Sequence, residues 1–238
     1  MRLPASLTGY TPFAQDAIST SLRGMQIQMA LLETGSSNLS YADVPGYQKK
    51  EAVISSFTDI LGRYGVSEIT NTDVGRIAST GNPLDLALGK PGYFQKRRQD
   101  GRIEHTRDGR FQLDKAGRLL SNDGFPILSQ VGKPIVFRTI PGNLSDIKIN
   151  DSGEIRAINP FTKIPEYIDT IGLVSDVGKP IVNAPELRQG FIESSNVLVF
   201  DAFAALAPVR RTFQANKQMF VNENQLLTRL IQELGRSQ

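Results

Sequence analysis

The chain has 238 residues, of which 39% are hydrophobic and 21% charged, the balance of a soluble protein with length for one or two domains. A net charge of +3 is too small to indicate nucleic acid by itself, and the absence of cysteine excludes disulfides and thiolate chemistry. No opening run has signal-peptide length and no segment approaches about 18 apolar residues, so the residues alone predict a cytoplasmic protein that is not membrane-inserted.

A helix is the first expected element. Thr11 is a suitable N-cap, Pro12 suits the first helical position and Gly35 is the expected stop. Apolar residues recur along it at steps of four and three, which predicts one apolar stripe made of Ala14, Ile18, Leu22, Met25, Met29 and Leu32. Residues 1–50 are therefore expected to form a helix and a following turn, and 51–80 an extended connector with a short helix possible over 51–61.

Short β-rich segments fill residues 81–188. Asp-Gly pairs at 100–101, 108–109 and 123–124, with Ala-Gly at 116–117, are strong local hairpin signals between apolar runs. The segments predicted as strands are 84–88, 93–97, 103–107, 111–113, 119–121, 125–128, 134–137, 147–149, 154–158 and 167–174. Their even spacing predicts a small antiparallel barrel or sandwich.

A seven-residue apolar repeat marks the last segment, 189–238. The repeat consists of Val199, Leu206, Phe213, Phe220, Leu227 and Leu234, whereas the row four residues further on is apolar only at its ends. Such a repeat predicts a coiled-coil helix, roughly 54 Å long from 199 to 234, with a kink before Pro208. The predicted fold class is α+β, with long N- and C-terminal helices pairing as a coiled coil around a central all-β domain. An amphipathic helix packed on its own domain is the alternative.

Motifs near both ends resemble those of the bacterial flagellar rod and hook proteins. The runs Gln189–Val197 and Arg210–Lys217 are similar to the family's two C-terminal motifs, in the family's order and spacing. The turn at 37–47 partly resembles its N-terminal motif, and the stretches 82–88 and 106–114 resemble its β-core motifs. In the turn, the matching positions are Asn38, Leu39, Pro45, Gly46 and Tyr47.

The resemblance implies a structural subunit of the flagellar basal-body rod that polymerises helically. Its partners would be other copies, other rod proteins, hook-side axial proteins and the export apparatus, with passage to the rod in the periplasm without a cleaved signal. The proximal-rod branch is favoured, and a distal-rod or hook-type relative is the alternative. The resemblance and the repeats together predict these interface residues: Ile18, Leu22, Met25, Met29, Asn38, Pro45, Gly46, Tyr47, Gln189, Gly190, Glu193, Ser195, Asn196, Val199, Leu206, Arg210, Phe213, Asn216, Phe220 and Leu227.

The residues offer little for catalysis. His105 is the only histidine, so a histidine-based metal site would lack partners. Three of the four aspartates at 85, 108, 114 and 123 lie in glycine turns, where turn chemistry explains them. With no phosphate loop, dinucleotide fingerprint or nucleophile elbow present, we expect no enzyme activity, no cofactor, no metal and no small-molecule substrate.

Basic residues gather on the expected hairpins. Lys96-Arg97-Arg98, Arg102, Arg107 and Arg110 alternate with the aromatic residues Tyr93, Phe94 and Phe111, a pattern that could suit a small β-barrel binding nucleic acid. Acidic residues such as Asp100 and Glu104 are interspersed, and the C-terminal repeat would then have no role. A solvated face or a polar subunit contact is therefore the favoured interpretation, without nucleic acid.

Overall fold

Two units make up the chain in this computed structural model, which describes residues 10–54, 66–181 and 186–236. The helical unit contains the described residues of 1–40, 50–70 and 198–238, and the β unit contains 41–49 and the described residues of 71–197. Each unit is described by itself below.

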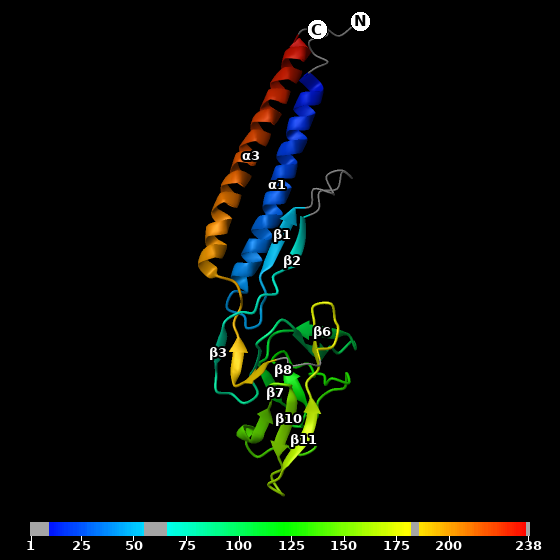
Figure 1. The fold of residues 1–238 in the computed structure, drawn as a ribbon. Helices are drawn as coiled ribbons and strands as arrows, with labels where there is room; N and C mark the ends of the chain where they lie inside the picture. The colour runs from blue at the N-terminus through cyan, green and yellow to red at the C-terminus, as the bar shows by residue number, and fades with distance from the viewer. Residues whose placement is uncertain (1–9, 55–65, 182–185, 237–238) are drawn as a thin grey trace. The chain divides into compact units, whose positions relative to one another are not determined.

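The helical unit holds two long helices and one strand pair. Helix α1 spans Tyr10–Ser40 and α3 spans Val199–Arg236; they lie side by side and run in opposite directions (Figure 1). Strands β1 (Lys50–Ile54) and β2 (Val66–Thr70) pair antiparallel, with Lys50 opposite Thr70, and pack beside α1. The short helix considered over 51–61 is wrong for 51–54, which belong to strand β1. Residues 55–61 of that prediction lie outside the described residues.

Gly35 does not end the first helix, which continues to Ser40. A Cβ at Gly35 would lie 2.5 Å from the Cδ2 atom of Leu206 on α3. Glycine therefore leaves room here for the Leu206 side chain to pack closely on α1, and it does not adopt the left-handed conformation of a C-terminal cap. A stop inferred from glycine alone cannot distinguish these two uses.

The prediction that the terminal helices pair as a coiled coil is wrong. A coiled coil buries apolar residues along a continuous seam. The buried side chains described in α1 are the polar Ser21, Thr34 and Asn38, while Leu22 and Met29 of the predicted stripe are 41% and 59% exposed. No side chain described in α3 is buried.

Small and polar groups share the α1–α3 contact with half-buried apolar side chains. Gly24 lies against the Asn216 side chain, and the Ser21 hydroxyl donates to Glu223 Oε2 at 3.2 Å. The half-buried residues described in α3 are Ala202, Leu206, Val209, Phe213, Asn216, Phe220, Glu223 and Leu227. The second row thus lies three residues after the first, and it contains the polar Asn216 and Glu223.

The β unit consists of short strands, several of which have the predicted bounds, but the predicted strands at 125–128 and 134–137 are wrong, because these stretches form only isolated bridges. Predicted strands at 93–97, 111–113, 119–121, 147–149 and 154–158 are confirmed residue for residue. The strands are β3 Ile77–Ser79, β4 Leu86–Leu88, β5 Tyr93–Arg97, β6 Ile103–Thr106, β7 Phe111–Leu113, β8 Leu119–Ser121, β9 Ile147–Ile149, β10 Glu154–Ile158, β11 Pro165–Thr170, β12 Leu173–Val174, β13 Leu187–Gln189 and β14 Phe191–Glu193. A 3₁₀ turn, Leu144–Asp146, precedes β9.

The predicted barrel or sandwich is also wrong. Among its described residues the β unit forms five small antiparallel sheets: β11-β10-β9, β12-β5-β6, β13-β4, β14-β3 and β7-β8. Ladders this short cannot continue around a closed barrel. Asp108-Gly109 does not close a hairpin either, because β6 pairs with β5 and β7 with β8, and Gly109 lies against the Leu86 carbonyl.

One apolar core joins these sheets. Leu86, Ile127 and Ile135 are fully buried, and the rings of Phe94 and Phe111 meet edge to face with centroids 5.0 Å apart. The long-range pairs β13-β4 and β14-β3 bring residues 187–193 beside 77–88. These pairs place the C-terminal motif against the first strands of the unit.

Candidate assembly site

The predicted interface residues fall into two groups, one in each unit. Pro45, Gly46, Tyr47, Gln189, Gly190, Glu193, Ser195 and Asn196 belong to the β unit, and the others belong to the helical unit. We name residues 41–49 together with 189–197 the motif cluster, because the structure joins these two stretches.

Backbone hydrogen bonds hold the motif cluster together. The Gly46 N–H donates to the Glu193 carbonyl at 2.8 Å, and the Asn196 N–H donates to the Tyr47 carbonyl at 3.3 Å. The Tyr47 ring stacks on Tyr41 with centroids 5.1 Å apart. The turn and the C-terminal motif, nearly 150 residues apart in the chain, thus form one local structure.

Asn196 joins its own segment to two others through its side-chain amide. Its Oδ1 accepts the Lys49 N–H at 2.6 Å, and its Nδ2 donates to the carbonyls of Asn71 and Asp73 at 3.1 and 3.0 Å. Only a side chain that both donates and accepts can make this set of bonds. Ser195 has a local role, since its hydroxyl accepts the Val197 N–H at 3.1 Å.

Glu193 forms a buried ion pair with Arg107. The two side chains are 2% and 1% exposed, with Arg107 Nη2 2.6 Å from Glu193 Oε2. Glu193 Oε1 also accepts the Gly75 N–H, and Arg107 Nη1 donates to the Gly92 carbonyl. The sequence pattern groups Arg107 with the basic residues of the hairpins and misses its burial. Its position in the motif at 106–114 is the one sequence feature that could have indicated a structural role.

Gly46 packs against backbone. Its φ is +71°, and a Cβ there would meet the Arg107 carbonyl carbon and the Asp108 nitrogen. Both the conformation and the space therefore require glycine. Pro45, which precedes it, is half-buried.

Gln189 and Gly190 form the start of the C-terminal motif. The Gln189 side chain donates to the carbonyls of Pro83 and Ile147 at 2.8 and 2.9 Å and accepts the Ile149 N–H at 3.2 Å. Gly190, at φ +81°, accepts the Thr80 N–H at 2.9 Å. Both residues hold distant backbone segments together in the β unit.

In the helical unit, Asn38 is the predicted residue with the clearest structural role. It is 4% exposed, and its amide exchanges two hydrogen bonds with the Lys50 backbone, at 2.7 and 2.8 Å. Nearby, the Thr34 hydroxyl donates to Glu68 at 2.9 Å and Lys50 Nζ lies 3.1 Å from the same carboxylate. These bonds lower the pKa of Glu68, the Thr34 bond most strongly.

The other helical residues divide by exposure. Ile18, Met25, Leu206, Phe213, Asn216, Phe220 and Leu227 are half-buried, whereas Leu22, Met29, Val199 and Arg210 are exposed. A groove of about 920 Å³ runs between α1 and α3, and Leu32, Leu206, Arg210 and Phe213 are among its lining residues.

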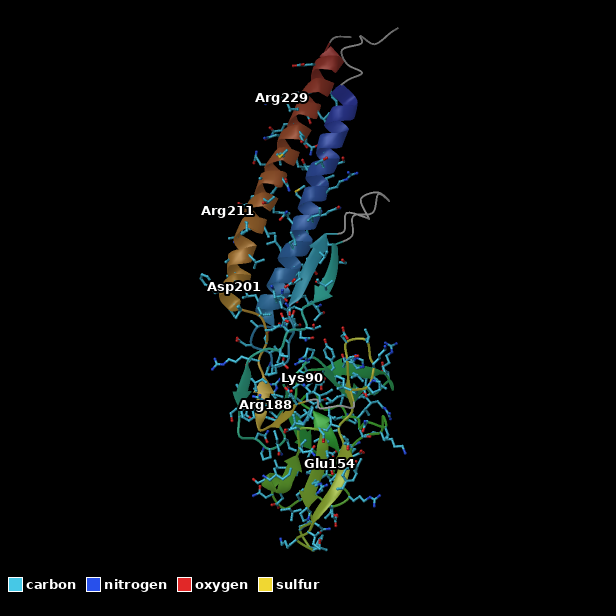
Figure 2. All side chains as sticks on the ribbon, in the orientation of Figure 1. Lys90, Glu154, Arg188, Asp201, Arg211 and Arg229 are labelled. Atoms are coloured by element: carbon cyan, nitrogen blue, oxygen red, sulfur yellow. The ribbon has the colours of Figure 1, made fainter. Side chains whose placement is uncertain are left out.

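The basic hairpin surface is neutralised mostly by neighbouring carboxylates. Lys96 lies 2.6 Å from Asp123, Arg98 lies 3.0 Å from Glu104, and Arg110 lies 2.7 Å from Asp108. Elsewhere in the β unit, Glu154, labelled in Figure 2, pairs with Arg156 at 2.8 Å. His105 is exposed and stacks beside Tyr93. Mixed pairing of this kind favours the solvated or subunit-contact interpretation over a basic nucleic-acid surface.

Other kinds of site are not found among the described residues. In residues 10–54, 66–181 and 186–236, no three His, Asp or Glu side chains are grouped to hold a metal ion. Within the same ranges, neither helix combines the length and apolar character needed to span a bilayer. What the structure does contain is a polar network of motif residues and two long helices with exposed apolar side chains, the features of a structural subunit.

Comparison with known proteins agrees with this class. Residues 88–157 match the family model described as the flagellar hook protein FlgE/F/G D1 domain. The chain is 26% identical to the flagellar basal-body rod protein FlgG of Buchnera aphidicola subsp. Acyrthosiphon pisum (strain APS), over 90% of this chain and 96% of the relative. It is 23% identical to FlgG of Agrobacterium fabrum (strain C58 / ATCC 33970), over 88% and 96%. These similarities support a protein of the flagellar rod and hook family.

Proposed function

We propose that this chain is a structural subunit of the flagellar basal-body rod, which polymerises helically through its terminal helices and transmits torque from motor to hook. The observation that carries the proposal is similarity to rod proteins over almost the full length of both chains. The match to the D1-domain model lies within the β unit, so the similarity is not confined to the terminal helices.

The surface of α3 supports assembly through this helix. Phe200, Phe203, Met219, Leu226 and Ile231 are between 54% and 83% exposed. Exposed large apolar side chains on one element mark a contact surface. A head-to-tail contact between unlike surfaces that does not close into a ring produces a helical polymer.

Position in the rod is a further part of the proposal. The motifs at 82–88, 124–128 and 132–136 resemble the proximal-rod branch, whereas the relatives above carry the name FlgG and the family model covers FlgE, FlgF and FlgG together. A distal-rod subunit is compatible with the same observations. In either position the neighbours would be other rod and hook proteins. The subunit would reach them by passing through the flagellum's own export apparatus.

The double change Phe213→Ala and Phe220→Ala tests the function. Both side chains are half-buried on α3, so their loss should cost less than the roughly 3–5 kcal/mol of a fully buried Phe and leave the core of the β unit intact. In cells lacking the natural protein, we expect the variant to be exported but not incorporated, with short rods and no swimming.

Phe161→Ala in the β unit is the matched control, since this side chain is 86% exposed and its loss should leave swimming unchanged. Electron microscopy of basal bodies and a motility assay measure the outcome. Full-length rods and normal swimming with the double variant would contradict the proposed role of α3.

A further inference from the structure

The groove between α1 and α3 combines an apolar wall with a positively charged rim. Leu32 of α1 and Leu206 and Phe213 of α3 supply apolar surface in this space of about 920 Å³. Arg210, Arg211 and Lys217 line the same groove, and no Asp or Glu does. Arg211, labelled in Figure 2, and its two basic neighbours are exposed.

These three cations are not neutralised within the described chain. No described carboxylate lies within ion-pair distance of Arg210, Arg211 or Lys217, unlike the paired cations of the β unit. Charge complementarity therefore calls for an occupant with apolar residues and an acidic group.

The outer surface of α3 carries such a set of residues. Ala215, Met219, Leu226 and Glu233, which we name the outer stripe, are spaced by four, seven and seven residues and so share one face. All are exposed, Met219 by 54% and Leu226 by 58%. In the part of α3 that the structure describes, Glu233 makes no ion pair.

We propose that the groove receives the outer stripe of α3 from a second copy of this chain, an inference that rests on the proposed function. With the two α3 helices parallel and shifted by about 19 residues, or roughly 28 Å, Leu226 of one copy lies beside Ala207 of the next. The same shift places Glu233 opposite Gln214, between Arg211 and Lys217. Met219 then meets Phe200, a favourable sulfur–aromatic contact.

Cysteine cross-linking tests this register, because the natural chain has no cysteine. Two differently tagged copies, one with Ala207→Cys and the other with Leu226→Cys, would be expressed together in cells lacking the natural protein. Positions 207 and 226 are roughly 28 Å apart on one helix, far beyond the ~7 Å limit for a disulfide, so a disulfide joining them must link two copies.

Asn224→Cys is the matched control for Leu226→Cys. Asn224 is exposed on the same helix but lies about 200° around the helix axis from position 226. Rods from the 207/226 pair should yield at least about ten-fold more doubly tagged dimer after oxidation than rods from the 207/224 pair, because disulfides form only at short range.

The outcomes separate this inference from the proposed function. Rods that assemble without the 207/226 dimer, or in which the Ala207→Cys copy is linked to a different rod protein, would overturn the register while the rod function stands. Rods built normally without this gene would overturn the function itself. If the cysteine variants do not assemble, Lys217→Glu and Glu233→Lys replace them: each alone should lower incorporation, both together should restore it, and failure to restore would overturn the contact.

Discussion

Arg107, Glu193 and Asn196 illustrate how single polar residues organise the motif cluster. Arg107 and Glu193 are almost completely buried, so removing either partner would leave an uncompensated charge, at a cost of about 3–5 kcal/mol. Asn196 bonds backbone groups of Lys49, Asn71 and Asp73, all more than 120 residues away in the chain. The C-terminal motif is therefore a structural motif of the β unit as well as a family signature.

Gly46→Ala should destabilise the β unit more than Gly124→Ala. Both glycines have positive φ, which costs another residue about 1–2 kcal/mol. A Cβ at Gly46 would also meet the backbone of Arg107 and Asp108, whereas nothing lies within 4 Å of a Cβ at Gly124. Urea unfolding should show a free-energy loss at least about 2 kcal/mol larger for Gly46→Ala. Equal losses would mean that the backbone contact yields without cost.

Among the elements, α1 and β2 are linked by the Thr34–Glu68 bond. Thr34→Val should raise the pKa of Glu68 toward its ordinary value of 4.5, since the Thr34 hydroxyl is the largest cause of the lowered pKa. An NMR titration of the Glu68 carboxyl would measure this shift. Thr34→Ser keeps the hydroxyl and is the control; a Glu68 pKa unchanged in Thr34→Val would rule out the bond as its cause.

The lowered pKa also sets the sign of the pH dependence. The folded chain holds the Glu68 carboxylate in its charged form more strongly than the unfolded chain does. The stabilisation is therefore present above pH 4.5 and is lost as the pH falls from there through the folded-state pKa. Thr34→Val should flatten this part of the stability profile.

At the scale of the whole molecule, the two units differ in how they are stabilised. Sixteen buried apolar residues form the core of the β unit, whereas the helical unit buries no large apolar side chain among its described residues. Helices without a buried apolar face depend on neighbours for stability. Assembly would supply neighbours to α1 and α3.

Hydrogen exchange on the purified monomer should reflect this difference. We expect fast exchange of backbone amides over 12–34 and 199–234 and slow exchange over 84–174, because local opening is easiest where few apolar contacts are lost. Mass spectrometry of peptides from each region measures it. Equal protection of the helices and the β unit in the monomer would contradict assembly-dependent order.

The local sequence was sufficient to predict most of the short strands and one apolar row of the C-terminal helix. Strands such as 93–97 and 119–121 were predictable because glycine turns bound each β-rich run, and Gly101, Gly117 and Gly124 do have positive φ. The row Leu206, Phe213, Phe220 and Leu227 is half-buried in the α3 face that lies toward α1. The motifs at both ends also predicted the family that the similar proteins support.

Tertiary structure decided the partners of these elements. The polar contact face of α1, the close approach at Gly35, the burial of Arg107 and the pairing of β13 with β4 all depend on residues distant in the chain. A periodic apolar pattern indicates which side of a helix is apolar, but the glycines and polar groups of the facing helix decide which residues make contact. Helix and strand propensities depend on residues close together in the chain. They therefore cannot predict which distant residues pack against each other.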